Sequence, residues 1–201
     1  MGLCVPALLV TSSASATVMV EVPLEELVLG AEAIVHATVV ESDERVVMDD
    51  GELEPCTFTT LEVREWLGGQ PRSGASSTVV LRELGGTFQG ITRRAEGTPR
   101  YAVGDEVIVF LARRPDGARD YRTMAMAQGK FIVRRGVGGM ETTVERDLEG
   151  ISFATPGEAN AIRHPQTDAR MELSAFLAYV RQTRGETLAA EPPSPPTGGA
   201  R

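Results

Sequence analysis

The chain has 201 residues, of which 42% are hydrophobic and 24% charged, a composition typical of one globular domain with short appendages. Its formal net charge is −8, and its paired arginines are dispersed and flanked by acids. A nucleic-acid-binding protein needs a basic stripe that releases counterions from the phosphates, so the composition argues against that function class.

The first sixteen residues predict a signal peptide. Residues 1–16 carry no charged side chain, and the apolar run Leu3–Val10 is followed by Ala14-Ser15-Ala16, which has the pattern of a cleavage site. The run is shorter than the about 20 apolar residues that span a bilayer, and no other segment has transmembrane character. The basic start of a signal peptide is missing, and a ragged cytosolic N-terminus is the alternative. We expect a secreted or periplasmic protein without a membrane span.

A short helix is predicted over 22–32, where Glu25 and Glu26 suit the positive end of the helix dipole and Gly30 suits a C-terminal stop. Alternating apolar side chains and turn signals then predict strands at 33–48, 56–67, 77–84, 106–112, 121–135 and, as a sixth, 141–148. Five or six antiparallel strands with glycine-rich corners favour a small OB-like barrel, which we expect to occupy residues 17–150.

The C-terminal part of the chain is patterned less regularly. Residues 151–185 are predicted to form an irregular segment and then a helix over 168–183, where Leu173 and Phe176 begin an apolar face at helical spacing. The proline-rich tail 186–201 cannot build a core and is predicted to be disordered. The expected architecture is mainly β, with a barrel between a short N-terminal helix and a C-terminal helix.

The glycines in the stretch 83–111 have two interpretations. A phosphate cradle needs glycines that lead into the N-terminus of a helix, with a suitable lysine or a G-x-G-x-x-G spacing. Here Gly85, Gly86 and Gly90 lead into residues without helical periodicity, and the only lysine lies forty residues further on. We therefore expect these glycines, together with Gly104, to serve backbone geometry at a corner of the sheet.

Three segments resemble a recurring pattern in uncharacterised exported bacterial proteins: LEELVLGAEAIVHATV at 24–39, the glycine-rich centre at 84–111 and GKFIV at 129–133. Those proteins are similar to the netrin and metalloproteinase-inhibitor branch of OB folds. The resemblance covers residues 22–150 and implies an OB-like barrel, with no settled biochemical role to carry over. The inhibitors act through a disulfide-bonded N-terminal cysteine, whereas cleavage here would leave Cys56 alone, so that mechanism does not transfer.

No catalytic or metal-binding constellation is recognisable. The two histidines, His36 and His164, stand in no ligand spacing, and no nucleophile elbow is present. The acidic stretch 41–54 is either a solvated hairpin tip or a calcium site, although it lacks the spacing of a calcium-binding loop. Cys56 is either a reactive thiol or, as we expect, a small buried side chain. The sequence predicts no enzyme activity, no metal and no cofactor.

A recognition patch is predicted on the loop 85–100. Tyrosine and arginine are enriched at the centres of interfaces, and the candidates are Phe88, Arg93, Arg94, Arg100 and Tyr101. Alternatively, Phe88 and Tyr101 plug the open end of the barrel. We expect a non-enzymatic exported module that presents this loop to a protein or glycan partner. The alternatives are an inhibitor of an extracellular protease and a cell-surface hydrolase.

Overall fold

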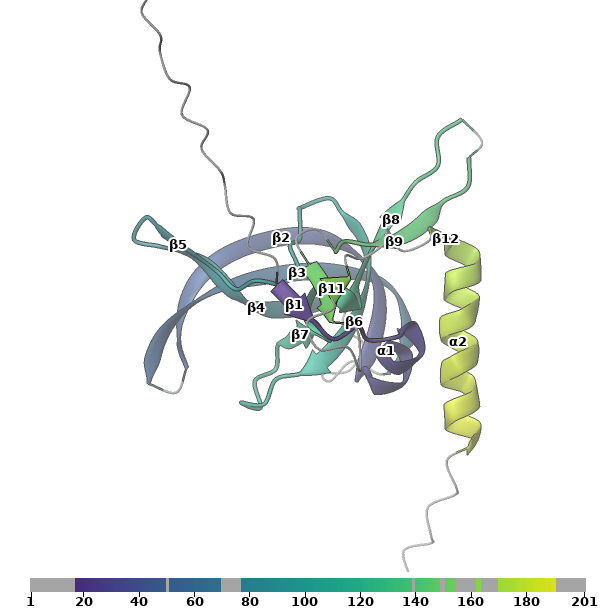
Figure 1. Ribbon diagram of the computed structural model, residues 1–201, viewed down its shortest axis with the longest axis horizontal. Helices are drawn as coiled ribbons and strands as arrows, with labels where there is room; N and C mark the ends of the chain where they lie inside the picture. The colour runs from purple at the N-terminus through teal and green to yellow at the C-terminus, as the bar shows by residue number, and fades with distance from the viewer. Residues whose placement is uncertain are drawn as a thin grey trace, which may run out of the picture.

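The computed structural model describes residues 17–49, 51–69, 77–138, 140–148, 151–154, 162–163 and 170–190. These residues form a mainly β structure with two α-helices (Figure 1). The predicted signal peptide 1–16, His164 and residues 191–201 lie outside the described ranges. The elements are β1 (Thr17–Met19), α1 (Leu24–Gly30), β2 (Ala33–Asp49), β3 (Glu52–Gly68), β4 (Thr78–Phe88), β5 (Ile91–Arg94), β6 (Glu106–Arg113), β7 (Tyr121–Thr123), the 3₁₀ helix η1 (Met126–Gly129), β8 (Lys130–Arg134), β9 (Thr143–Arg146), β10 (Ile151–Ala154), β11 (Ile162–Arg163), β12 (Met171–Glu172) and α2 (Leu173–Ala190).

The larger sheet is mixed. Its strands lie in the order β12-β9-β8-β6-β2-β3-β4-β5, and β7 pairs with both β4 and β6. The pairings β2–β3–β4–β7–β6 therefore lead back to β2, and all are antiparallel except β4–β7, where Leu81 pairs with Tyr121 in parallel. Strand direction cannot alternate throughout a closed path of five strands, so one parallel pair is unavoidable. The predicted β-rich class is confirmed, but a purely antiparallel sheet is wrong.

A second, smaller sheet forms from segments that the sequence did not mark as strands. β1 pairs in parallel with β10, and β10 pairs antiparallel with β11. β10 and β11 fall within residues 151–166, which were predicted to be irregular. Phe153 of β10 is 1% exposed and packs with Ile151, Leu148 and Ala127 in a small apolar cluster, and burial of these side chains stabilises β10 against the body of the protein.

Strand β6 runs through the centre of the core. Its residues Val107–Leu111 are fully buried, as an apolar run on both faces predicts. Successive side chains of a strand point to opposite faces. Ile108 and Phe110 join a cluster against the helices, the helix-side cluster, whereas Val107 and Val109 join a cluster with side chains of β2, β3 and β4.

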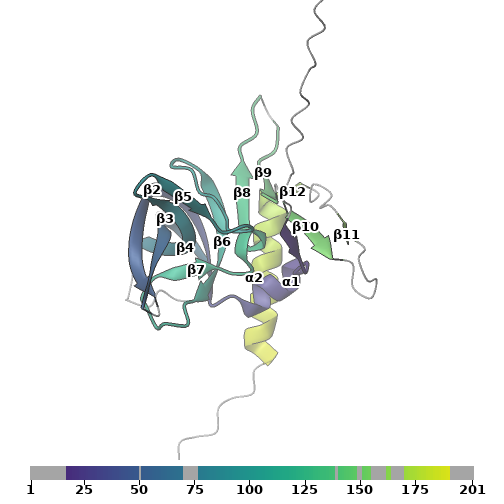
Figure 2. The same cartoon turned by 60° about the vertical axis from the view of Figure 1, so that its left-hand side comes forward.

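The two helices lie on one side of the curved strands β2, β3 and β4 (Figure 2). Leu27 of α1 and Phe176 and Val180 of α2 are buried in the helix-side cluster. α2 was predicted over 168–183, and it continues to Ala190, through residues that were assigned to the tail. Among the described residues, no helix has both the length and the apolar character needed to cross a membrane.

The segment 85–100 is not the long loop that the sequence predicted. β4 continues to Phe88 and β5 returns along it, so the first ten residues of the segment form a hairpin that projects from the body of the molecule (Figure 1). Gln89 and Gly90 make the turn with positive φ angles of 49° and 77°, as a two-residue type I′ turn requires. The prediction missed the hairpin because glutamine is not among the residues that favour this turn.

The strand predicted over 121–135 is interrupted. β7 ends at Thr123, η1 follows, and β8 begins at Lys130. Ala125 and Met126 have positive φ angles of 51° and 57°, which are incompatible with a continuous strand. Thr123 before the interruption and Lys130 after it both contact the side chain of Tyr101.

Candidate functional site

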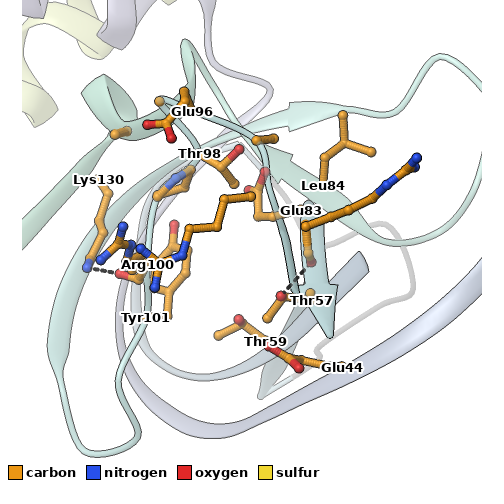
Figure 3. A pocket seen from close by; sticks show the side chains of 18 of the residues that line it. Glu44, Thr57, Thr59, Glu83, Leu84, Glu96, Thr98, Arg100, Tyr101 and Lys130 are labelled. Carbon is orange, nitrogen blue, oxygen red and sulfur yellow. Dashed lines mark hydrogen bonds between the residues drawn. The ribbon is translucent and has the colours of Figure 1, made fainter. Parts of the chain in front are cut away.

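A cavity of about 620 Å³ lies between the β4–β5 hairpin and the strands behind it (Figure 3). Its walls come mainly from β3, the end of β4, β5, the following segment 95–101 and the start of β8, and other elements add Glu44, Ala127, Asp147 and Ile151. Most of its lining residues are polar, charged or glycine. We call it the hairpin cavity.

The irregular segment 95–101 is held in place by hydrogen bonds from outside the hairpin. Ala127 N–H donates to the carbonyl oxygen of Gly97 at 2.9 Å, and Lys130 Nζ donates to the carbonyl oxygen of Arg100. These contacts fix the backbone on both sides of Pro99, which is itself buried. The side chains that the segment offers to the cavity are therefore carried on an anchored backbone rather than on a free loop.

Glu83 is a buried carboxyl in the cavity wall. The residue is 9% exposed, and its Oε1 accepts the Thr123 N–H at 2.6 Å. Burial raises the pKa of Glu83 to about 7, against the hydrogen bonds from Thr123 and the charges of Arg114 and Arg122, which lower it. Near neutral pH a large share of this carboxyl is protonated, so it offers a hydrogen-bond donor as well as acceptors.

Lys130, which is buried, and Tyr101, which is half-buried, complete this part of the wall. The Tyr101 hydroxyl lies 2.7 Å from Thr123 Oγ1, and Lys130 Nζ lies 4.9 Å from the centroid of the Tyr101 ring, within cation–π range. Burial raises the pKa of Tyr101 well above its ordinary value, and the charge of Glu83 adds to the effect. Burial lowers the pKa of Lys130, opposed chiefly by Asp147. Three ionisable groups with shifted pKa values thus meet at one cavity, a property typical of functional sites.

Three exposed arginines line the cavity: Arg93, Arg94 and Arg100. Arg93 Nη1 lies 3.9 Å from Glu54 Oε1, and such an exposed pair contributes little to stability. Within the described ranges, neither Arg94 nor Arg100 has an acidic side chain within ion-pair distance. Two guanidinium groups are therefore available to a ligand.

Four of the five residues predicted to form a recognition patch line this cavity: Arg93, Arg94, Arg100 and Tyr101. Phe88 does not; it lies beside the hairpin turn and is 39% exposed. Tyr101 is half-buried and packs against the apolar cluster of β2, β3, β4 and β6. The structure therefore divides the predicted patch into a cavity lining and one separate apolar side chain.

The predicted structural glycines lie at three bends. Gly85 and Gly86 line the cavity, and Gly85 has a φ of +105°. A Cβ atom on Gly85 would lie 3.1 Å from the carbonyl oxygen of Arg93, so a side chain there would press on β5. Gly90 is in the hairpin turn, and Gly104 N–H donates to the carbonyl oxygen of Val39 at 2.8 Å, just before β6.

Sequence reasoning missed Glu83, Thr123 and Lys130. Glu83 follows the apolar run Val79–Leu81 and stands beside Arg82 within a predicted strand, and Lys130 is the only lysine of the chain; both facts were visible signals. It also missed two threonines of β3. Thr57 Oγ1 donates to the carbonyl oxygen of Gly85 at 2.8 Å (Figure 3), whereas Thr59 Oγ1 is buried without a hydrogen-bond partner in the part of the chain that the structure describes.

A second charged cluster lies around Glu106. His36 Nε2 is 2.7 Å from Glu106 Oε1, and Arg135 donates two hydrogen bonds to the same carboxylate at 2.7 and 2.8 Å. Burial acts to raise the pKa of Glu106, but the hydrogen bonds from Arg135 and His36 outweigh it and lower the pKa. The cluster joins β2, β6 and the end of β8, so it has a clear structural role.

Neither the acidic stretch nor the cysteine forms a recognisable site. Among the described residues, no group of three or more His, Cys, Asp or Glu side chains is placed to hold a metal ion. Much of the stretch 41–54 lies in β2 and β3, paired across the ladder, rather than in a loop. Cys56 is a buried free thiol.

No protein-family model, curated protein or solved structure matches the chain. The chemistry of the hairpin cavity therefore carries the functional argument alone.

Proposed function

We propose that the protein is a non-enzymatic exported binding module, which presents the segment 85–100 and the hairpin cavity to a protein or glycan partner. The observation that carries this proposal is the meeting of Arg94, Arg100 and Tyr101 at one cavity with an anchored wall. A preformed cavity with a few fixed polar groups is typical of ligand sites. Export rests on the sequence of residues 1–16.

We also propose that β2, β3, β4, β6 and β7 form an OB-like barrel, related to the netrin and metalloproteinase-inhibitor branch. The closed path of pairings supports this, as does the parallel contact of Leu81 with Tyr121. OB barrels bind ligands on a sheet face and through adjoining loops. The hairpin cavity is lined by β3 and β4, but a fold alone does not specify a function.

An array of immobilised glycans and purified extracellular proteins tests the binding proposal. We expect the wild-type protein to bind at least one class, and the double variant Arg94→Gln/Arg100→Gln to bind it about tenfold more weakly or worse, since a hydrogen bond to a charged group contributes about 1.5–3 kcal/mol. Arg119→Gln, an exposed arginine in another loop, is the matched control. Equal binding by wild type and double variant would contradict the proposal.

A hydrolase is the second candidate, favoured by one observation. A carboxyl with a pKa of about 7 beside a cavity suits a general acid or base at neutral pH. Hydrolysis of a chromogenic glycoside or ester by the purified protein, abolished in Glu83→Gln, would replace the binding module with this function. Inhibition of an extracellular protease remains a prediction, and slowing of a panel of such proteases by the purified protein tests it.

A further inference from the structure

The lining of the hairpin cavity selects for a polar ligand. Ligand cavities for apolar molecules are lined mostly by apolar and aromatic side chains. Here threonine hydroxyls, glycine backbone and charged groups predominate, with Leu84 and Tyr101 among the few larger apolar surfaces. The volume of about 620 Å³ falls within the usual range for small ligands, about 300–1,000 Å³. A pyranose ring, with hydroxyl groups that both donate and accept, suits this lining and fits within this volume.

The charges around the cavity favour an anion, in a protein whose net charge is −8. Arg94 and Arg100 have no acidic partner among the described residues, and a guanidinium group matches the geometry of a carboxylate. Of the acids in the lining, Glu44 already accepts the Thr87 N–H at 2.9 Å. The lining carboxylate of Asp147 lies 3.9 Å from the Lys130 ammonium.

Two further acids line the cavity. Glu83 is buried, and near neutral pH its carboxyl is protonated to a large extent, which reduces its repulsion of an anion. Glu96 is exposed. The lining holds four basic side chains (Arg93, Arg94, Arg100 and Lys130) and four acidic ones (Glu44, Glu83, Glu96 and Asp147), so its charge is nearly balanced in a protein of net charge −8. Within it, Arg94 and Arg100 are the basic groups that no acidic side chain of the described residues pairs with.

We propose that the hairpin cavity binds a uronate, a pyranose that carries a carboxylate, either as a free sugar acid or as a residue of an acidic polysaccharide. This inference rests on the proposed binding function and names its ligand class. The carboxylate contacts Arg94 and Arg100, and the ring hydroxyls face Glu83 and the threonines of β3. An acidic peptide shares the carboxylate, but it would pair along the edge strand β5 rather than fill the cavity, and the tetraglutamate titration below separates the two ligands.

The only lysine of the chain provides a selective reporter for this site. In protein labelled with ¹⁵N-lysine, the one backbone amide signal belongs to Lys130, whose side chain lines the cavity. The full chain is titrated with glucuronate and galacturonate, with glucose and galactose as matched neutral sugars, with an oligogalacturonate, and with a tetraglutamate peptide. Each titration yields a shift of one signal and an affinity.

We expect both uronates to shift the Lys130 signal and to bind about tenfold more tightly than the neutral sugars, as expected for a charge-assisted contact. Arg94→Gln/Arg100→Gln should remove this difference, and Arg119→Gln should retain it. Tighter binding of the oligogalacturonate than of galacturonate would assign the site to a polysaccharide, and equal binding to a free sugar acid.

Three results would overturn the inference. Equal affinity for uronates and neutral sugars would exclude recognition of the carboxylate, and binding of tetraglutamate alone would replace the sugar with an acidic peptide; the binding module survives both results. Absence of any shift with all probes also overturns the uronate inference. In that case the glycan and protein array decides separately whether the binding module stands.

Discussion

The helix-side cluster and the wall of the hairpin cavity are both buried, yet they are built from opposite chemistry. In the helix-side cluster the Phe131 ring packs against Phe110 and Phe176, with centroid distances of 5.6 and 4.8 Å. In the cavity wall the buried groups are Glu83 and Lys130, held by hydrogen bonds and by an aromatic ring. The stability of the helix-side cluster depends on how completely its side chains fill the available space. The stability of the cavity wall depends on the protonation of its ionisable groups and on the hydrogen bonds made by its polar groups.

This difference assigns separate roles to the two regions. Apolar packing stabilises the fold over the whole pH range, because none of its groups titrates. A buried carboxyl and a buried ammonium cost free energy in their charged forms, and proteins keep such groups chiefly where they have a use.

The largest effect is expected for Phe176→Ala in the helix-side cluster. The side chain is 1% exposed, and truncation of a buried phenylalanine costs about 3–5 kcal/mol of the free energy of unfolding. Urea denaturation followed by the fluorescence of Trp66, the only tryptophan, measures it. Tyr179→Ala on the exposed side of α2 is the control and should cost much less. A loss below about 1 kcal/mol for Phe176→Ala would show that α2 is not part of the cooperative core.

The second prediction concerns the cavity wall and pH. Because the pKa of Glu83 is raised from 4.5 to about 7, the folded protein binds this proton more tightly than the unfolded chain does. The stabilisation is complete below pH 4.5 and is lost as the pH rises through 7, a change of about 3 kcal/mol in the free energy of unfolding from this group. Stability should therefore fall between pH 5 and pH 8.

Glu83→Gln isolates this contribution, since the amide oxygen still accepts the Thr123 N–H and carries no charge. We expect the variant to be more stable than wild type at pH 8 and nearly equal to it at pH 5, in urea denaturation at both values. Phe176→Ala, by contrast, should lower stability by the same amount at each pH. An unchanged slope in Glu83→Gln would mean that another group causes the pH dependence.

Much of the β architecture can be predicted from local sequence, because a strand that is buried on both faces consists of an uninterrupted run of apolar residues. The run Val107–Leu111 is apolar without interruption and forms the central strand β6. The helix at 22–32 was expected from its acidic start and its glycine end, and α1 lies within that range. These elements depend on the residues of one segment, so a single sequence is enough to predict them.

The cavity was not predictable in the same way. Glu83 and Thr123 meet because β4 and β7 run in parallel, with Leu81 opposite Tyr121, and no local pattern encodes a pairing across forty residues. Lys130 reaches the cavity because positive φ angles at Ala125 and Met126 break the strand, and neither residue favours that conformation. The candidate arginines were found because they are close in sequence, whereas Glu83, Thr123 and Lys130 were missed because they come from separate parts of the chain.

The third prediction compares two threonines of β3 that line the cavity. Thr57→Val removes a hydrogen bond to the carbonyl oxygen of Gly85 and should cost about 1 kcal/mol of stability. Thr59→Val removes a buried hydroxyl that has no partner in the described ranges, so stability should stay equal or rise by about 1 kcal/mol. Urea denaturation measures both, and a loss in Thr59→Val equal to that in Thr57→Val would show that the hydroxyl is satisfied.

The smallest effect is expected at the turn of the β4–β5 hairpin, which the sequence did not predict. Gln89 has a φ of 49°, a conformation that asparagine adopts more readily, so Gln89→Asn should stabilise the protein by about 0.5 kcal/mol. Gly90→Ala should act in the opposite direction, by about 1 kcal/mol, for a purely conformational reason: its φ is +77°, and an added Cβ meets no atom within 4 Å. Thermal unfolding of the two variants measures these changes, and amide hydrogen exchange of Phe88 and Ile91, the pair that flanks the two-residue turn, is the local readout. If protection at both amides rises in Gln89→Asn and falls in Gly90→Ala, the two-residue turn stabilises β5, the strand that carries Arg93 and Arg94. Equal exchange in all three proteins would show that the segment 95–101 alone holds the hairpin.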